Sequence, residues 1–134
     1  MRRMTLSILI LTAGIFLFSN GTSAHHGVAH YDMKKTIILT GTVAAFDWGN
    51  PHCLVHMDVM DDNGHFEHWT LEMSSIFAMS KRGWSKDTVK RGDQAVAETH
   101  PAQNGIPLGI SSGPDFALKF VVNGKEIGKE SSSR

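Results

Sequence analysis

The fold is decided by residues 52–73, which read HCLVHMDVM (52–60), DDNG (61–64) and HFEHWTLEM (65–73). Apolar and polar side chains alternate in the first and third of these segments, which is the pattern of strands with one buried face. The Asp-Asn-Gly between them is a strong turn signal. We therefore expect a β-hairpin with one face in a core and the other in solvent.

The faces of this hairpin also predict its register, because directly opposed residues share a face. A three-residue loop over residues 62–64, with its glycine in the left-handed conformation, places Met57 opposite Trp69 and Val55 opposite Leu71. The interior face is then expected to carry Cys53, Val55, Met57, Val59, Trp69, Leu71 and Met73. A two-residue Asn-Gly turn would mix the two faces, so we reject it.

The rest of the chain predicts further short strands and one helix. We expect strands over residues 36–47, 94–99 and 116–122, a loop over residues 103–114, and a helix over residues 75–82 capped by Ser74. Gly41 inside the first strand predicts a bulge or a sharp bend. The element order indicates an all-β fold with one short helix, a small five- to six-stranded OB-like Greek-key barrel. A generic small β-sandwich is the competing architecture.

The chain of 134 residues allows one domain. Residues 1–24 have the basic start, apolar run and small-residue end of a signal peptide cleaved after Ala24. The apolar run is shorter than the roughly 20 residues of a spanning helix, although an uncleaved anchor is the alternative. Residues 25–134 would form a single OB-like barrel domain with a short polar C-terminal tail, periplasmic or secreted and without a stable membrane span. Loss of the two leader arginines leaves 11 basic and 13 acidic residues, which argues against nucleic-acid binding.

Cleavage after Ala24 would place a free α-amine on His25, beside its own imidazole. With one further histidine this becomes a histidine brace, a nitrogen site suited to copper and, less tightly, zinc. We expect His52 as the third ligand, because it lies where a strand begins at the barrel rim, and we assign His26 a lesser role. The alternative is that the terminus is solvated and frayed.

A second polar cluster is expected on the outer face of the hairpin. The register places Asp58 opposite His68 and diagonal to His56, with β-carbons within about 5–8 Å of one another. A solvated polar face with a weak Asp58–His68 pair is the alternative. Glu72 is a supporting residue that orients a histidine or pairs with Arg82, which otherwise faces the helix dipole.

The most specific motifs of the chain are those around its tryptophans and its predicted cleavage point. They are Ala24-His25-His26, Trp48-Gly49-Asn50-Pro51-His52, Arg82-Gly83-Trp84 and Gly92-Asp93. With these the chain resembles an uncharacterised family of small exported bacterial proteins, known only as a domain of unknown function. The resemblance implies that the Ala-His-His junction follows a signal peptide, but it implies no activity. We expect Trp48 to support the fold by packing.

No residue pattern indicates an enzyme, because the chain has no His-Glu-x-x-His motif, no phosphate loop and no persuasive Ser-His-Asp order. We assign no catalytic residue and leave the question of enzyme activity open. The expected function is that of an exported, non-catalytic binding protein with copper or another transition metal as the leading ligand. The alternatives are an OB-type binding module for an envelope protein, a peptide or an oligosaccharide without metal, and a copper-dependent oxidase of histidine-brace type.

Overall fold

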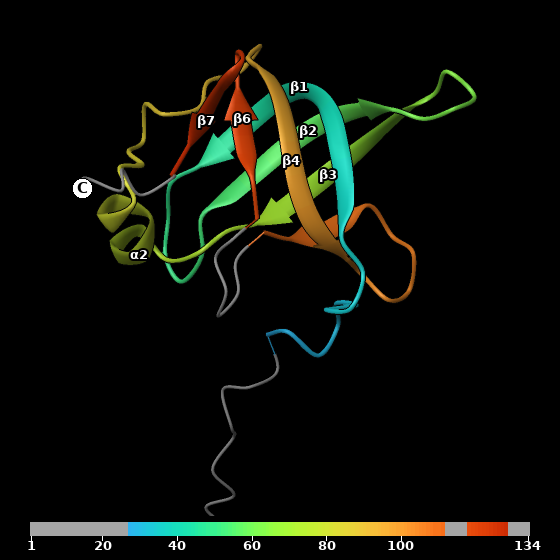
Figure 1. Cartoon of the computed structure of the whole chain (residues 1–134), viewed down its shortest axis with the longest axis horizontal. Helices are drawn as coiled ribbons and strands as arrows, with labels where there is room; N and C mark the ends of the chain where they lie inside the picture. Colours follow the sequence, from blue (N-terminus) through green and yellow to red (C-terminus); the bar gives the residue numbers. More distant parts are fainter. Residues whose placement is uncertain (1–26, 112–117, 129–134) are drawn as a thin grey trace, which may run out of the picture.

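The computed structural model describes residues 27–111 and 118–128, which fold mainly into β-strands (Figure 1). The elements are β1 (Ile37–Asp47), β2 (Leu54–Met60), β3 (Phe66–Glu72), α2 (Ile76–Lys81), β4 (Gln94–Pro101), β5 (Leu108–Ile110), β6 (Phe120–Val122) and β7 (Lys125–Ile127). None of the helices in these two ranges has the length and apolar character needed to cross a membrane.

Five of the strands close into a barrel. β1 pairs antiparallel with both β2 and β4, β2 pairs with β3, and β5 joins β3 in parallel and β4 antiparallel. This closed order of β1, β2, β3, β5 and β4, with the helix between β3 and β4, is that of an OB barrel. The predicted fold class is confirmed, and the β6–β7 hairpin extends the sheet beyond β4.

The hairpin of β2 and β3 has the predicted register. Met57 pairs with Trp69, Val55 pairs with Leu71, and Gly64 has a positive φ of 82°. The interior residues that are fully or nearly fully buried are Cys53, Val55, Met57, Leu71 and Met73. Val59 and Trp69 pack against this core but are only partly buried, so the interior position predicted for them is confirmed only in part.

Two elements differ from the sequence-based expectation. β5 (Leu108–Ile110) lies inside the predicted loop over residues 103–114, because a strand of three residues has no readable period and is defined by its partners on β3 and β4. The helix is capped by Ser75, not Ser74, because the Ser75 hydroxyl accepts from the backbone N–H of Ala78. Residues 116 and 117 of the predicted last strand lie outside the described residues.

The long strand β1 pairs with two neighbouring strands along different parts of its length. Its first half pairs with β4, its second half pairs with β2, and Gly41 pairs with both. The bulge lies after Gly41, between Val43 and Ala45. Gly41 itself lies where the backbone of β1 comes very close to the backbone of β2. Such a close approach is another reason, besides a bulge, for a glycine inside a strand.

Aromatic rings fill the end of the barrel near α2. Trp84 packs edge-on against Phe120 with ring centroids 5.2 Å apart, and it also contacts Phe46. Trp48 packs edge-on against Phe46 at 5.7 Å. The packing role predicted for Trp48 is therefore what the structure shows.

Candidate functional site

Residues 27–35, here called the amino-terminal segment, dock on the rim of the barrel. Tyr31 forms a β-bridge with Ala102, and the backbone N–H of Asp32 donates to the carbonyl of Pro101 at 2.9 Å. The side chain of Gln103 donates to the carbonyl oxygens of Ala29 and Tyr31, at 3.3 and 3.0 Å. The segment is thus attached where β4 ends.

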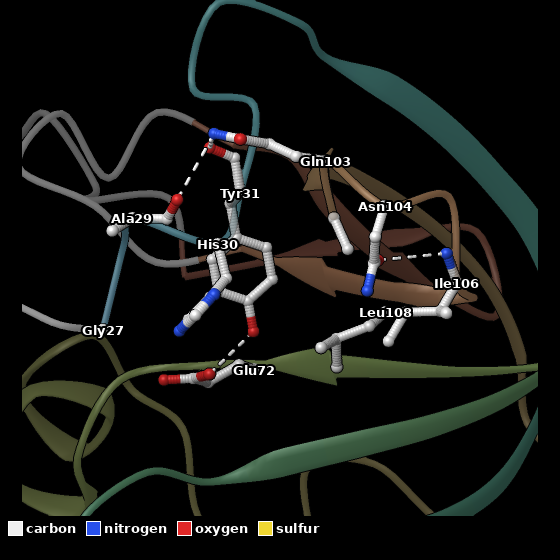
Figure 2. Close-up of a pocket in the computed structure, with 10 residues that line it drawn as sticks. Gly27, Ala29, His30, Tyr31, Glu72, Gln103, Asn104, Ile106 and Leu108 are labelled. Carbon is white, nitrogen blue, oxygen red and sulfur yellow. Dashed lines mark hydrogen bonds between the residues drawn. The ribbon is translucent and has the colours of Figure 1, made fainter.

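A cavity of about 550 Å³ lies between this segment and the chain that leads from β4 to β5 (Figure 2). Gly27 and Tyr31 line it from the segment, Glu72 lines it from the end of β3, and Ile106 and Leu108 contribute an apolar wall. The size is within the usual range for small-ligand sites.

The carboxylate of Glu72 joins the segment to the barrel. Its Oε2 accepts a hydrogen bond from the Tyr31 hydroxyl at 2.8 Å, which Figure 2 shows across the cavity. Its Oε1 lies 2.7 Å from Nδ1 of His52, just before β2. Of the two partners considered for Glu72, the structure shows a histidine. We call this arrangement the Tyr31–Glu72–His52 chain.

Burial affects which groups of the Tyr31–Glu72–His52 chain donate and which accept hydrogen bonds. The ring of Tyr31 is almost fully buried, and burial raises the pKa of its hydroxyl, with further contributions from the hydrogen bond and the negative charge of Glu72. The hydroxyl therefore remains a donor at neutral pH. An ionised carboxylate only accepts, so a neutral imidazole that bonds to it through Nδ1 carries its lone pair on Nε2.

This is the arrangement that orients histidines in metal sites. A metal-binding histidine usually donates its second ring N–H to a carboxylate, which fixes the tautomer and the ring orientation. The side chain of His52 is 45% exposed, whereas that of Glu72 is only 19% exposed. His52 is thus held by a largely buried carboxylate and remains accessible from solvent.

The other predicted site residues fall into separate groups. His25 and His26 lie outside the described residues. Nδ1 of His68 lies 2.5 Å from Oδ1 of Asp58, as the register predicts.

His56 is held by different partners. Its Nε2 lies 3.0 Å from Oδ2 of Asp47 on β1, and its Nδ1 lies 3.1 Å from the hydroxyl of Thr70 on β3. A histidine on the central strand of three reaches both neighbours, so His56 is not held by Asp58. Among residues 27–111 and 118–128, no three His, Cys, Asp or Glu side chains gather as a metal-binding group.

Arg82 forms the C-cap of α2, the position expected from the sequence. Its backbone N–H bonds to the carbonyls of Met79 and Ser80. A cation there faces the negative end of the helix dipole. Glu72, which the sequence also offers as a partner for Arg82, has its two carboxylate oxygens bonded to Tyr31 and His52.

Sequence reasoning missed Tyr31 and Gln103. Tyr31 lies 41 residues before Glu72, and Gln103 lies 72 residues after Tyr31. Neither residue belongs to a periodic segment or a motif, so no local pattern connects them with the site. The one available signal is that Tyr31 is the single tyrosine of the sequence.

A family model described as "Family of unknown function (DUF6152)" matches residues 14–111. The matched range includes the amino-terminal segment and all five strands of the barrel. No curated protein and no solved structure matches the chain. The chemistry of the site therefore has to be argued from its own residues.

Proposed function

The chain belongs to this family of unknown function, and we propose that its mature form is an exported, non-catalytic protein that binds one transition-metal ion at the barrel rim. The proposed ligands are the α-amine and imidazole of His25 and the Nε2 atom of His52. His26 has a lesser role. The proposal includes cleavage after Ala24, which frees the amine, and a periplasmic or secreted location.

One observation carries the proposal: His52 is bonded to Glu72 beside the docked amino-terminal segment. Gly27 lines the same cavity as Glu72. His25 precedes Gly27 by two residues, and two extended residues span about 7 Å. The α-amine of a chain that begins at His25 would therefore be attached within two residues of the cavity wall that Glu72 also lines, and Glu72 is the carboxylate bonded to His52.

The charge of the site supports a cation. Glu72 is bonded to Tyr31 and His52, which are both neutral donors when His52 is deprotonated, so the pair leaves the carboxylate negative. A largely buried negative charge is costly when it is uncompensated. A divalent ion on Nε2 of His52 would offset that charge through the imidazole.

Copper is the first choice of metal. Affinity at nitrogen ligands rises along the divalent series to copper and is lower for zinc. The ligands must be deprotonated, so binding weakens as the pH falls through the range in which free imidazole titrates, at about pH 6.5.

Copper titration of the processed protein tests the proposal. Mass spectrometry of the exported protein first establishes whether residue 1 is His25. We expect one Cu(II) per chain, and a loss of affinity of about tenfold or more when one glycine precedes His25 or when His52→Ala removes the rim ligand. His65→Ala is the matched control, because His65 lies in the exposed β2–β3 turn beside Asp61.

Equal affinity of the native and extended termini would contradict the proposal. A metal-free OB module for an envelope protein, a peptide or an oligosaccharide would then be the better reading.

A further inference from the structure

Tyr31 connects two parts of the molecule that are far apart in the sequence. Its backbone pairs with Ala102 and holds the amino-terminal segment on the rim. Its hydroxyl crosses the cavity to Oε2 of Glu72, whose other oxygen lies against His52 (Figure 2). One residue thus takes part both in docking the segment and in holding the carboxylate.

We infer that Tyr31 is a positioning residue: its hydroxyl fixes Glu72, and Glu72 fixes His52 in the tautomer whose free nitrogen is Nε2. Docking of the amino-terminal segment and presentation of the imidazole are then coupled through one residue. The consequence for metal affinity rests on the proposed function, but the effect on the tautomer does not.

The burial of Glu72 gives its partners this influence. With 19% of its side chain exposed, Glu72 is largely shielded from bulk solvent, and the hydrogen bonds that it accepts from Tyr31 and His52 contribute strongly to holding its carboxylate in place. Loss of the Tyr31 hydroxyl leaves Oε2 without that donor. The carboxylate then rotates to recover hydrogen bonds, and the bond from Nδ1 of His52 is weakened.

Removing the hydroxyl alone separates positioning from packing. Tyr31→Phe keeps the ring, which is 4% exposed, and keeps the backbone bridge to Ala102. Glu72→Leu removes the acceptor at a similar side-chain size. Glu67→Leu is the control, because Glu67 is an exposed carboxylate on the same strand that bonds to Trp69.

The first readout is the tautomer of His52 in the metal-free protein, measured from long-range proton–nitrogen NMR spectra at a pH where the imidazole is neutral. We expect the proton on Nδ1 in the wild type and in Glu67→Leu. We expect it mainly on Nε2 in Glu72→Leu, and a reduced Nδ1–H fraction in Tyr31→Phe. An unchanged fraction in Tyr31→Phe would overturn the inference.

The second readout is Cu(II) affinity. Loss of a group that orients a ligand costs about 10–100-fold in metal affinity, which we expect for Glu72→Leu, and about threefold to tenfold for Tyr31→Phe. Because Tyr31 acts through Glu72, the double variant should bind as weakly as Glu72→Leu alone. Additive losses would show that Tyr31 acts by another route, such as docking alone, and would contradict the inference.

The two proposals fail in different ways. Copper binding that does not depend on His25 or His52 contradicts the proposed function, and the tautomer measurement still decides the role of Tyr31. Copper binding that depends on both histidines, with wild-type affinity and tautomer in Tyr31→Phe, supports the proposed function and overturns the inference.

Discussion

Gly41 of β1 passes so close to Asp58 of β2 that a β-carbon at position 41 would collide with the carbonyl oxygen of Asp58. The obstacle is backbone, which cannot swing aside as a flexible side chain does. We expect Gly41→Ala to lower the free energy of unfolding by about 1–3 kcal/mol, measured by urea denaturation. Gly49→Ala is the control, because nothing lies within 4 Å of a β-carbon there. Equal stability of the two variants would show that β1 and β2 are farther apart than described.

Tyr31 should ionise only at strongly alkaline pH. Burial, followed by the hydrogen bond and charge of Glu72, raises the pKa of the Tyr31 hydroxyl above its usual value. Tyr31 is the single tyrosine, so phenolate absorbance reports on it alone. We expect the native transition at a higher pH than the transition in denaturant.

The same shift predicts a loss of stability in alkali. The folded state retains the Tyr31 proton above about pH 10, where the unfolded state releases it. The stabilisation is therefore complete below that pH and is lost as the pH rises through the folded-state pKa. Tyr31→Phe should lack this part of the pH dependence of the free energy of unfolding. If the variant loses stability in alkali as the wild type does, Tyr31 is not the group responsible.

The hairpin register predicts opposite responses at two positions of β3. Leu71 is fully buried, so Leu71→Ala should lower the free energy of unfolding by about 2–5 kcal/mol. Phe66 is 62% exposed, and Phe66→Ala should change the free energy of unfolding by less than about 0.5 kcal/mol. Chemical denaturation of both variants checks the register, because a shift of one residue would exchange the two faces.

Cys53 should react slowly with thiol reagents in the native protein. Its side chain is fully buried, and burial raises the pKa of the thiol, although its contact with the carbonyl of Gly49 opposes this. The reactive form is the thiolate. Burial therefore slows the reaction in two ways: it keeps the reagent away from the sulfur, and it lowers the thiolate fraction by raising the thiol pKa. Labelling should become fast in denaturant, and equally fast labelling without denaturant would show that the core beside the start of β2 is open to solvent.

The part of the fold that could be predicted is the part with a local period. β2 and β3 alternate strictly, and their turn has one loop length that matches the faces, so even the pairing of Met57 with Trp69 follows from the sequence. β5 could not be predicted, because its three residues become a strand only through distant partners such as Glu72.

The candidate site, too, could be predicted only where a local sequence pattern marks its residues. His52 and Glu72 could be identified, since one precedes a strand and the other ends one. The sequence does not identify His52 as the partner of Glu72, because the two residues lie 20 positions apart and the directions of their side chains depend on the barrel rim. The contribution of Tyr31 depends on docking of the amino-terminal segment, which no local pattern indicates.

The docking of that segment also determines when the rim can be completed during folding. Its hydrogen bonds to His100 and Gln103 close sequence separations of 65 to 74 residues. Such distant contacts form after the local hairpins, because their loop-closure entropy must first be offset. Residues 27–35 are therefore among the last to reach their native positions, and a chain that lacks the end of β4 cannot dock them. An incompletely synthesised chain that ends before β4 cannot display this rim, because His100 and Gln103, which hold the segment in place, are then missing.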